Sequence, residues 1–170
     1  AAPWKVIMLK ITPRRLLPTL IAILLTVPAF AQPQLSEIRI DQPGNDDDEY
    51  FELTGTPSSS LSGFTYLVIG DGAGGSGVIE EVTDLGGQSL PASGLFVAAE
   101  ATFTLGSADL TVDLNFEEAD NVTHMVVSSF TGADGQDLDT DDDGVLDLTP
   151  WSQIVVGVEV LAVGAGEARH

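Results

Sequence analysis

A row of aspartates at alternating positions carries the most specific chemistry in this sequence. Asp139, Asp141 and Asp143 stand two residues apart, Gly144 follows them, and Asp147 completes the segment. Carboxylate oxygens at alternate positions, with a glycine for the sharp turn, suit Ca²⁺, which binds about six to eight oxygens in flexible geometry. We therefore predict a structural Ca²⁺ site in this loop.

The same loop differs from that of a helix-flanked calcium sensor. Val145 can offer its backbone carbonyl as a further ligand, and Leu146 is placed to dock in the core. Pro150 stands where an EF-hand has its bidentate glutamate, and no helical pattern flanks the loop. The pattern is typical of the short calcium loops of secreted modules. The alternative interpretation is a solvated acidic loop without an ion.

A second acidic run covers Asp46 to Glu49, within the predicted turn of the first hairpin. Contiguous residues of an extended chain point in different directions, so they converge poorly on one ion. We interpret this run as a solvated turn. It would join an ion site only if the fold brought it close to the first group.

Catalytic chemistry finds little support in the sequence. There is no cysteine, and the histidines are His124, in an apparent strand, and the terminal His170. The chain holds six Lys and Arg against 26 Asp and Glu, for a formal net charge of −20. Because nucleic-acid affinity depends on basic residues that neutralise phosphates, such binding is not expected. We predict a protein that is not an enzyme.

Residues 1–31 have the pattern of a cleavable signal peptide. Basic residues precede an apolar run, 16–27, and small residues follow at both specificity positions of a cleavage site that ends at Ala31. The run is shorter than the roughly 20 residues that span a bilayer. We expect export to the extracellular space, the cell surface or the periplasm, without a membrane span after cleavage. Residues 1–7, before Met8, are interpreted as upstream sequence.

Residues 32–163 predict one all-β domain, followed by a polar tail, 164–170. Short alternating runs separated by turn residues favour a β-sandwich held by its core, since no disulfide is possible. The glycine-rich segment 70–77 contains G-x-G-x-x-G, but β-branched alternation follows it, which indicates a hairpin loop and not a dinucleotide site. The expected strands span 35–41, 50–53, 64–69, 78–83, 95–99, 110–116, 122–129 and 154–163.

Strict alternation assigns faces to these strands. Ser36 and Ile38 should share one face of the first strand. Ile79 and Glu81 should share one face of the fourth. The run 110–116 is the cleanest half-buried pattern in the chain, with apolar residues at every second position.

The segments LSEIRIDQPG, EYFEL, LSGFTYLVIGDG and IEEVTDLGGQSLPASGLFVAAE occur in this order. Together they resemble the bacterial secreted type of the lamin-tail domain family, over residues 35–163. The resemblance implies an immunoglobulin-like β-sandwich that serves as a binding or structural module, with no catalytic residues to carry over. The lamin tails of animal nuclei present basic surfaces, and the acidity of this chain argues against DNA binding by analogy.

These observations leave three functional hypotheses. The first is a secreted, non-catalytic interaction or structural module with a Ca²⁺-stabilised loop, whose partner is a protein or a surface glycan. The second is the N-terminal accessory domain of a larger secreted nuclease- or phosphatase-type hydrolase, with its catalytic domain outside this chain. The third is a carbohydrate-binding module that uses exposed aromatic residues, namely Trp151, Tyr50 or Tyr66.

Overall fold

The computed structural model describes residues 32–40, 47–72, 75–114, 116 and 121–160. The predicted signal peptide, the polar tail and Asp46 lie outside these residues. The regular secondary structure of the described residues consists of strands, without a helix, so the all-β prediction is confirmed. The strands are β1 (Gln34–Arg39), β2 (Tyr50–Thr54), β3 (Phe64–Gly70), β4 (Val78–Asp84), β5 (Leu95–Ala99), β6 (Leu110–Thr111), β7 (Val122–Ser128) and β8 (Gln153–Val160).

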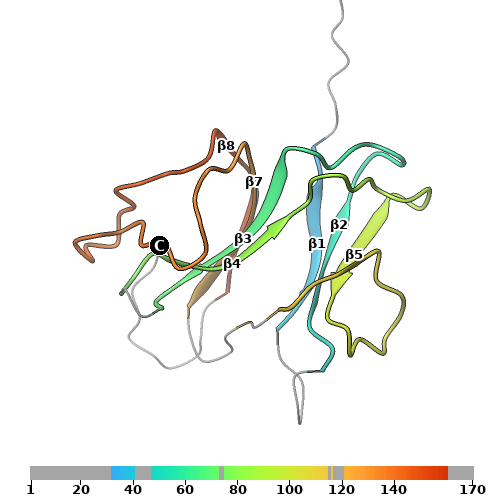
Figure 1. Ribbon diagram of the computed structural model, residues 1–170, viewed down its shortest axis with the longest axis horizontal. Helices are drawn as coiled ribbons and strands as arrows, with labels where there is room; N and C mark the ends of the chain where they lie inside the picture. The colour runs from blue at the N-terminus through green and yellow to red at the C-terminus, as the bar shows by residue number, and fades with distance from the viewer. Residues whose placement is uncertain (1–31, 41–46, 73–74, 115, 117–120, 161–170) are drawn as a thin grey trace, which may run out of the picture.

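The strands form two four-stranded sheets, in the orders β1-β2-β5-β6 and β4-β3-β7-β8 (Figure 1). The main core contains buried side chains from both sheets, as a β-sandwich requires. Phe51 of β2 stacks on Tyr66 of β3, with ring centroids 3.8 Å apart. Phe51 and Leu53, two residues apart on β2, share one face of the strand and are both fully buried.

A second apolar cluster lies on the opposite face of the β4-β3-β7-β8 sheet. Its buried members are Leu67, Ile69, Ile79, Met125, Val127 and Leu138. The connection from β7 to β8 supplies Leu138 and packs Phe130, Leu146 and Trp151 against the cluster. In Figure 1 this connection is the orange segment beside the sheet. β3 is therefore covered on both faces, which accounts for its continuous apolar run.

A bulge changes the faces of β1. Leu35 pairs with Leu53 and Glu37 pairs with Glu52, so Ser36 is an additional residue in the ladder. Its hydroxyl donates to the Glu52 carboxylate at 2.8 Å. Leu35 and Ile38 both pack against the core. The prediction that Ser36 shares the face of Ile38 is therefore wrong, because alternation does not continue through a bulge.

A second bulge changes the faces of β4. Glu81 pairs with Val68, which belongs to the main core, whereas Ile79 pairs with Ile69 of the outer cluster. Glu80 is the additional residue between them. The prediction that Ile79 and Glu81 share a face is wrong for this reason. Glu81 lies instead on the side of the strand that faces the other sheet.

The strand predicted over 110–116 is reduced to β6, which pairs with β5 in parallel. β5 ends at Ala99, whose carbonyl accepts a hydrogen bond from Val112 N at 3.0 Å, so no further strand backbone remains to pair with. The alternation is nevertheless meaningful. Leu110, Val112, Leu114 and Phe116 all belong to the main core or pack against it.

Candidate metal centre

The acidic loop is attached to the start of β4 by backbone hydrogen bonds. Leu138 N donates to Gly77 O at 3.0 Å, and Ile79 N donates to Gln136 O at 3.0 Å. Gly135 N in turn donates to Ile79 O at 2.8 Å. Leu138 is fully buried in the outer cluster. The backbone that leads into the aspartates is therefore fixed against the sheet.

Asp139 is the buried anchor of the loop, with no exposed surface. Its Oδ1 accepts a hydrogen bond from Asp143 N at 3.2 Å, and its Oδ2 accepts one from Gly144 N at 2.9 Å. The hydroxyl of Ser76 donates to the same Oδ2 at 2.6 Å. These donors orient the carboxylate and join the acidic loop to the β3–β4 loop.

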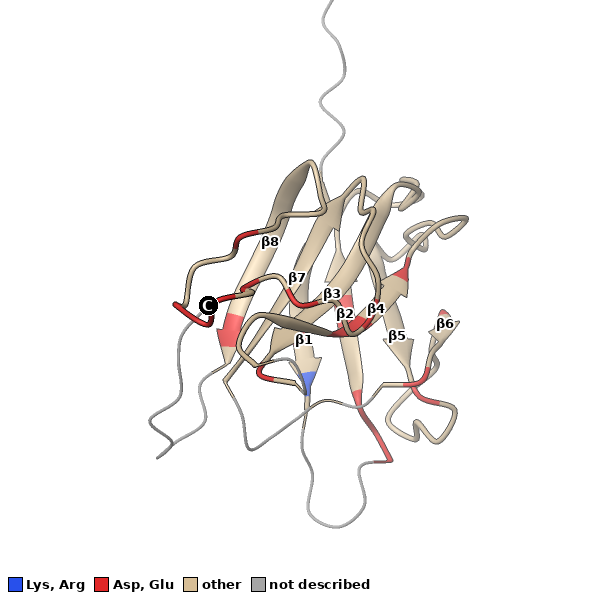
Figure 2. Cartoon of the chain, turned by 60° about the vertical axis from the view of Figure 1, so that its left-hand side comes forward, with Lys and Arg blue, Asp and Glu red and all other residues tan. Residues whose placement is uncertain are grey.

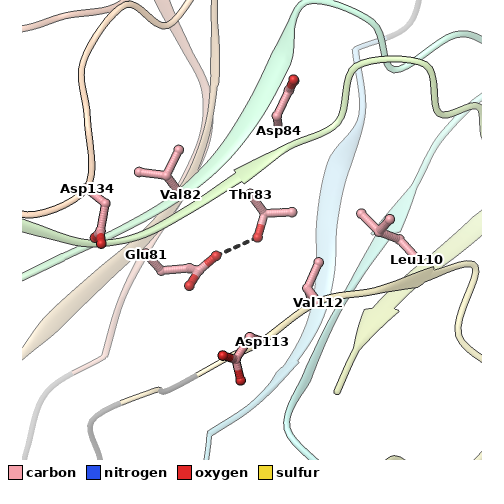
Figure 3. Close-up of a pocket in the computed structure, with 8 residues that line it drawn as sticks. All are labelled: Glu81, Val82, Thr83, Asp84, Leu110, Val112, Asp113 and Asp134. Atoms are coloured by element: carbon pink, nitrogen blue, oxygen red, sulfur yellow. Dashed lines mark hydrogen bonds between the residues drawn. The ribbon is translucent and has the colours of Figure 1, made fainter. Parts of the chain in front are cut away.

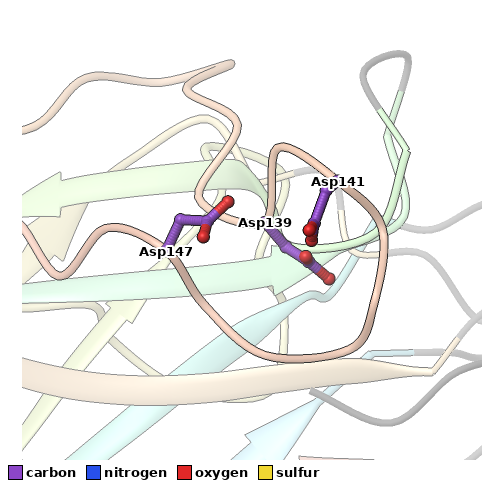
Figure 4. A group of neighbouring side chains, drawn as sticks. All are labelled: Asp139, Asp141 and Asp147. Carbon is purple, nitrogen blue, oxygen red and sulfur yellow. The ribbon is translucent and has the colours of Figure 1, made fainter.

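Asp139, Asp141 and Asp147 form a group in which one ligand oxygen from each lies within 4.8 Å of the others. Figure 4 shows the carboxylates of Asp139 and Asp141 directed toward each other, with Asp147 beside them. Two oxygens bound to the same Ca²⁺ at about 2.4 Å cannot be more than about 4.8 Å apart. The three carboxylates can therefore share one metal ion.

The charges of this group repel each other. The pKa of Asp141 is raised, chiefly by the negative charge of Asp143, then by partial desolvation and by the charges of Asp147 and Asp139. Close carboxylates oppose each other's ionisation, and a cation between them removes that cost. The electrostatics of the loop thus favour a bound cation.

Asp143, a predicted side-chain ligand, lies outside this group. Asp143 uses Oδ1 to accept a hydrogen bond from Val145 N at 2.9 Å, which closes a local turn. The side chain of Val145 is exposed, whereas Leu146 packs against the outer cluster, as predicted. Asp147 accepts a hydrogen bond from Thr140 N at 3.0 Å, which closes the loop across its base.

A contact that the sequence pattern did not predict joins the glycine-rich loop to the acidic loop. Ser76 N donates to Asp142 Oδ1 at 2.9 Å, in addition to the contact of its hydroxyl with Asp139. Gly77 has a φ of +78°, and a Cβ there would lie 2.7 Å from Asp139 Cβ. Glycine is therefore required both by the backbone conformation and by the close approach. In the sequence, the only local indication of this contact is a hydrogen-bonding serine, Ser76, placed between Gly75 and Gly77.

Among the described residues of the second acidic run, 47–49, none belongs to the group of Asp139, Asp141 and Asp147. Glu49 is buried, and its Oε2 accepts a hydrogen bond from Phe116 N at 3.2 Å. Asp48 accepts one from the hydroxyl of Thr104 at 3.0 Å, while Asp47 is exposed. The prediction of a solvated turn is wrong for Glu49, because its carboxylate serves as an internal acceptor for backbone.

The aromatic residues considered for glycan binding are less accessible than expected. Tyr66 is fully buried, and its hydroxyl lies 2.6 Å from Nδ1 of His124, so the prediction that it is exposed is wrong. Tyr50 packs edge-on against Phe103, and Trp151 packs against the outer cluster. His124 is also fully buried, and burial lowers its pKa to about 4.

Comparisons of this chain with protein-family models, with curated proteins and with solved structures gave no significant match. Among the residues that the structure describes, no helix has the length and apolar character needed to cross a membrane. The function is therefore inferred from the structure and from the chemistry of its side chains.

Proposed function

We propose that this protein is a secreted, non-catalytic β-sandwich module whose acidic loop binds a structural Ca²⁺ ion, and that it serves in interaction or spacing outside the cell. The observation that carries the proposal is the close group of Asp139, Asp141 and Asp147. These residues lie on the segment that covers the outer face of the β4-β3-β7-β8 sheet. An ion in this group would hold that cover in place.

The chemistry of the loop favours Ca²⁺ over transition metals. The group offers carboxylate oxygens alone, which suit hard cations. Asp141 and Asp147 are exposed, which leaves room for water to complete a coordination sphere of variable number. Asp143 and the carbonyl of Val145 are the proposed additional ligands. A loop that stays this open fits the weak affinities of extracellular modules, with Kd of about 10⁻⁴ to 10⁻³ M.

The proposed fold identity is an immunoglobulin-like sandwich of the lamin-tail type. The strand orders support the first part of this identity. β1-β2-β5 corresponds to an A-B-E sheet, and β4-β3-β7-β8 corresponds to a C′-C-F-G sheet. The ordered sequence motifs over residues 35–163 support the second part. The leader pattern of residues 1–31 supports export.

Thermal unfolding with and without Ca²⁺ tests this proposal. We expect millimolar Ca²⁺ to raise Tm by several degrees relative to chelator, since a ligand that binds only the folded state stabilises it by mass action. The same concentration of Mg²⁺ should raise Tm by less, because Mg²⁺ requires stricter octahedral geometry. Asp141→Asn and Asp147→Asn should abolish the Ca²⁺ shift.

The control is Asp134→Asn, which removes one exposed carboxylate from the same β7–β8 connection but lies outside the group. It should retain the full Ca²⁺ shift. A wild-type Tm that is unchanged across all Ca²⁺ concentrations would contradict the proposal. An equal loss in Asp134→Asn would show that the effect is general screening of charge.

A further inference from the structure

A groove lies between the edges of the two sheets, where β4 faces the segment that follows β6. Its volume is about 340 Å³, which is at the small end of ligand-binding sites. Figure 3 shows the side chains that line it. They are Glu81, Val82, Thr83 and Asp84 from β4, Leu110, Val112 and Asp113 from β6 and the residues after it, and Asp134.

The edge of β4 is only partly covered. β4 is the last strand of its sheet, and the backbone of Ile79 in its first part pairs with Gly135 and Gln136 of the β7–β8 connection. Leu85 N donates to Phe64 O, so alternation along an antiparallel ladder directs the backbone groups of Val82 and Asp84 away from β3. Among the described residues, no backbone hydrogen bond is made to the N–H or C=O groups of Val82 and Asp84 on the edge of β4 that faces away from β3.

The groove is acidic around an apolar floor. Glu81 lies between Asp134 and Asp113 in Figure 3, and the hydroxyl of Thr83 donates to its Oε1 at 2.6 Å. The pKa of Glu81 is raised by burial first, and then by the charges of Asp134 and Asp113. Val112 supplies apolar surface beside these carboxylates. No Lys or Arg lines the groove, so the negative charge of these carboxylates has no positive counterpart there.

We propose that this groove binds a short, extended segment of a partner protein that carries Lys or Arg, and that this segment adds as a strand to the open edge of β4. Strand addition at an exposed sheet edge is a recurring mode of peptide recognition, with backbone bonds for affinity and side-chain pockets for specificity. A basic side chain can extend its apolar stem over Val112 and place its charge between Glu81 and Asp113.

Charge identifies the partner as a different protein and not a second copy of this chain. From residue 32 onward, two basic residues, Arg39 and Arg169, stand against all 26 acidic ones. Figure 2 shows the acidic residues spread over strands and loops and, among the residues that the structure describes, one basic segment at the end of β1. A second copy would bring more negative charge to an already acidic groove, which opposes association.

The inference is independent of the proposed Ca²⁺ site. The groove and the metal centre share no residue, so peptide binding can be measured in chelator, where the metal centre is empty. Loss of Ca²⁺ binding and loss of peptide binding are therefore distinguishable outcomes.

The test uses the full chain and two fluorescent peptides of the same composition, in which Lys alternates with Thr. One peptide has an ordinary backbone, and in the other alternate amides are N-methylated on the edge that would pair with β4. Fluorescence anisotropy in low salt with chelator should show saturable binding of the ordinary peptide. The methylated peptide should bind at least about tenfold more weakly, because its charge is retained but its strand pairing is lost.

A double variant tests the side chains. Glu81→Gln with Asp113→Asn should weaken binding of the ordinary peptide by about tenfold or more, since charge-assisted hydrogen bonds are lost. Glu159→Gln with Asp47→Asn removes the same charge from exposed positions outside the groove and should have little effect. Amide exchange should show new protection at Val82 and Asp84 when the peptide is bound.

Three results would overturn the inference. The first is the absence of binding at low salt by the folded wild-type protein. The second is equal affinity for the ordinary and methylated peptides, which would show attraction by charge alone. The third is equal weakening by the groove variant and the control variant, which would place the peptide elsewhere on the acidic surface.

Discussion

The hydroxyl of Ser76 donates a hydrogen bond of 2.6 Å to Oδ2 of Asp139, which joins two loops 63 residues apart in the sequence. The same serine donates its backbone N–H to Asp142. The β3–β4 loop and the acidic loop therefore act as one structural unit. A change in either loop should alter the stability and the ion binding of the other.

Replacement of Gly77 tests this coupling. Gly77→Ala combines a strained positive φ with a Cβ placed 2.7 Å from Asp139 Cβ. We expect it to lower the free energy of unfolding by roughly 1–3 kcal/mol and to weaken Ca²⁺ binding. Gly87→Ala is the matched control, because Gly87 has a φ of +79° and nothing lies within 4 Å of its Cβ position. Urea unfolding of both variants measures the difference, and equal losses would contradict the importance of the close approach.

Substitutions of Asp139 and of Asp141 should change the stability of the metal-free protein in opposite directions. Asp139→Asn weakens a buried acceptor of three hydrogen bonds, so its Tm in chelator should fall below that of the wild type. Asp141 is exposed and repelled by its neighbours, so Asp141→Asn should melt slightly above the wild type in chelator. Both variants should lose the Ca²⁺ shift. Calorimetry with and without Ca²⁺ checks this, and a fall in chelator for Asp141→Asn would disagree with the repulsion.

His124 should make the protein less stable in mild acid. Its pKa in the folded state is about 4, against an ordinary value of 6.5, so the unfolded state binds the proton more readily. Its contribution is complete above pH 6.5 and is lost as the pH falls toward 4, by up to about 3 kcal/mol. Urea unfolding of the wild type and of His124→Gln at pH 7 and pH 4.5 isolates this term. The variant should lack this part of the fall, and parallel curves would disprove the assignment.

Leu138 should matter because it anchors the cover of the outer face. Leu138→Ala removes a fully buried side chain from the outer cluster and should cost about 2–5 kcal/mol. Leu105→Ala is the control, because that leucine is 58% exposed and its loss should cost little. Denaturant unfolding compares the two. Similar small effects would mean that the cover contributes little to stability.

The sequence predicted the strands better than it predicted their faces. Phe51 and Leu53 follow simple alternation and are both buried. Alternation fails at Ser36 and at Glu80, because a bulge adds one residue and turns the following side chains to the other face. A bulge depends on tertiary packing, so local periodicity does not reveal it.

The candidate site was predictable in its composition but not in its contacts. The alternating aspartates indicated a cation, and the structure gathers Asp139, Asp141 and Asp147. The role of Ser76 depends on a long-range contact that no local pattern contains. Glu49 shows the same limit, since its burial depends on the backbone of Phe116, far along the chain.

The covered outer face of the β4-β3-β7-β8 sheet has a consequence for solubility. Release of the β7–β8 connection would uncover Leu67, Met125 and Val127 while the main core remained closed. Such a partial opening precedes complete denaturation when one layer is held by fewer contacts. An uncovered apolar sheet face promotes self-association. If the proposed Ca²⁺ ion holds this connection in place, we expect calcium depletion at moderate temperature to appear first as increased light scattering by a protein that is still largely folded.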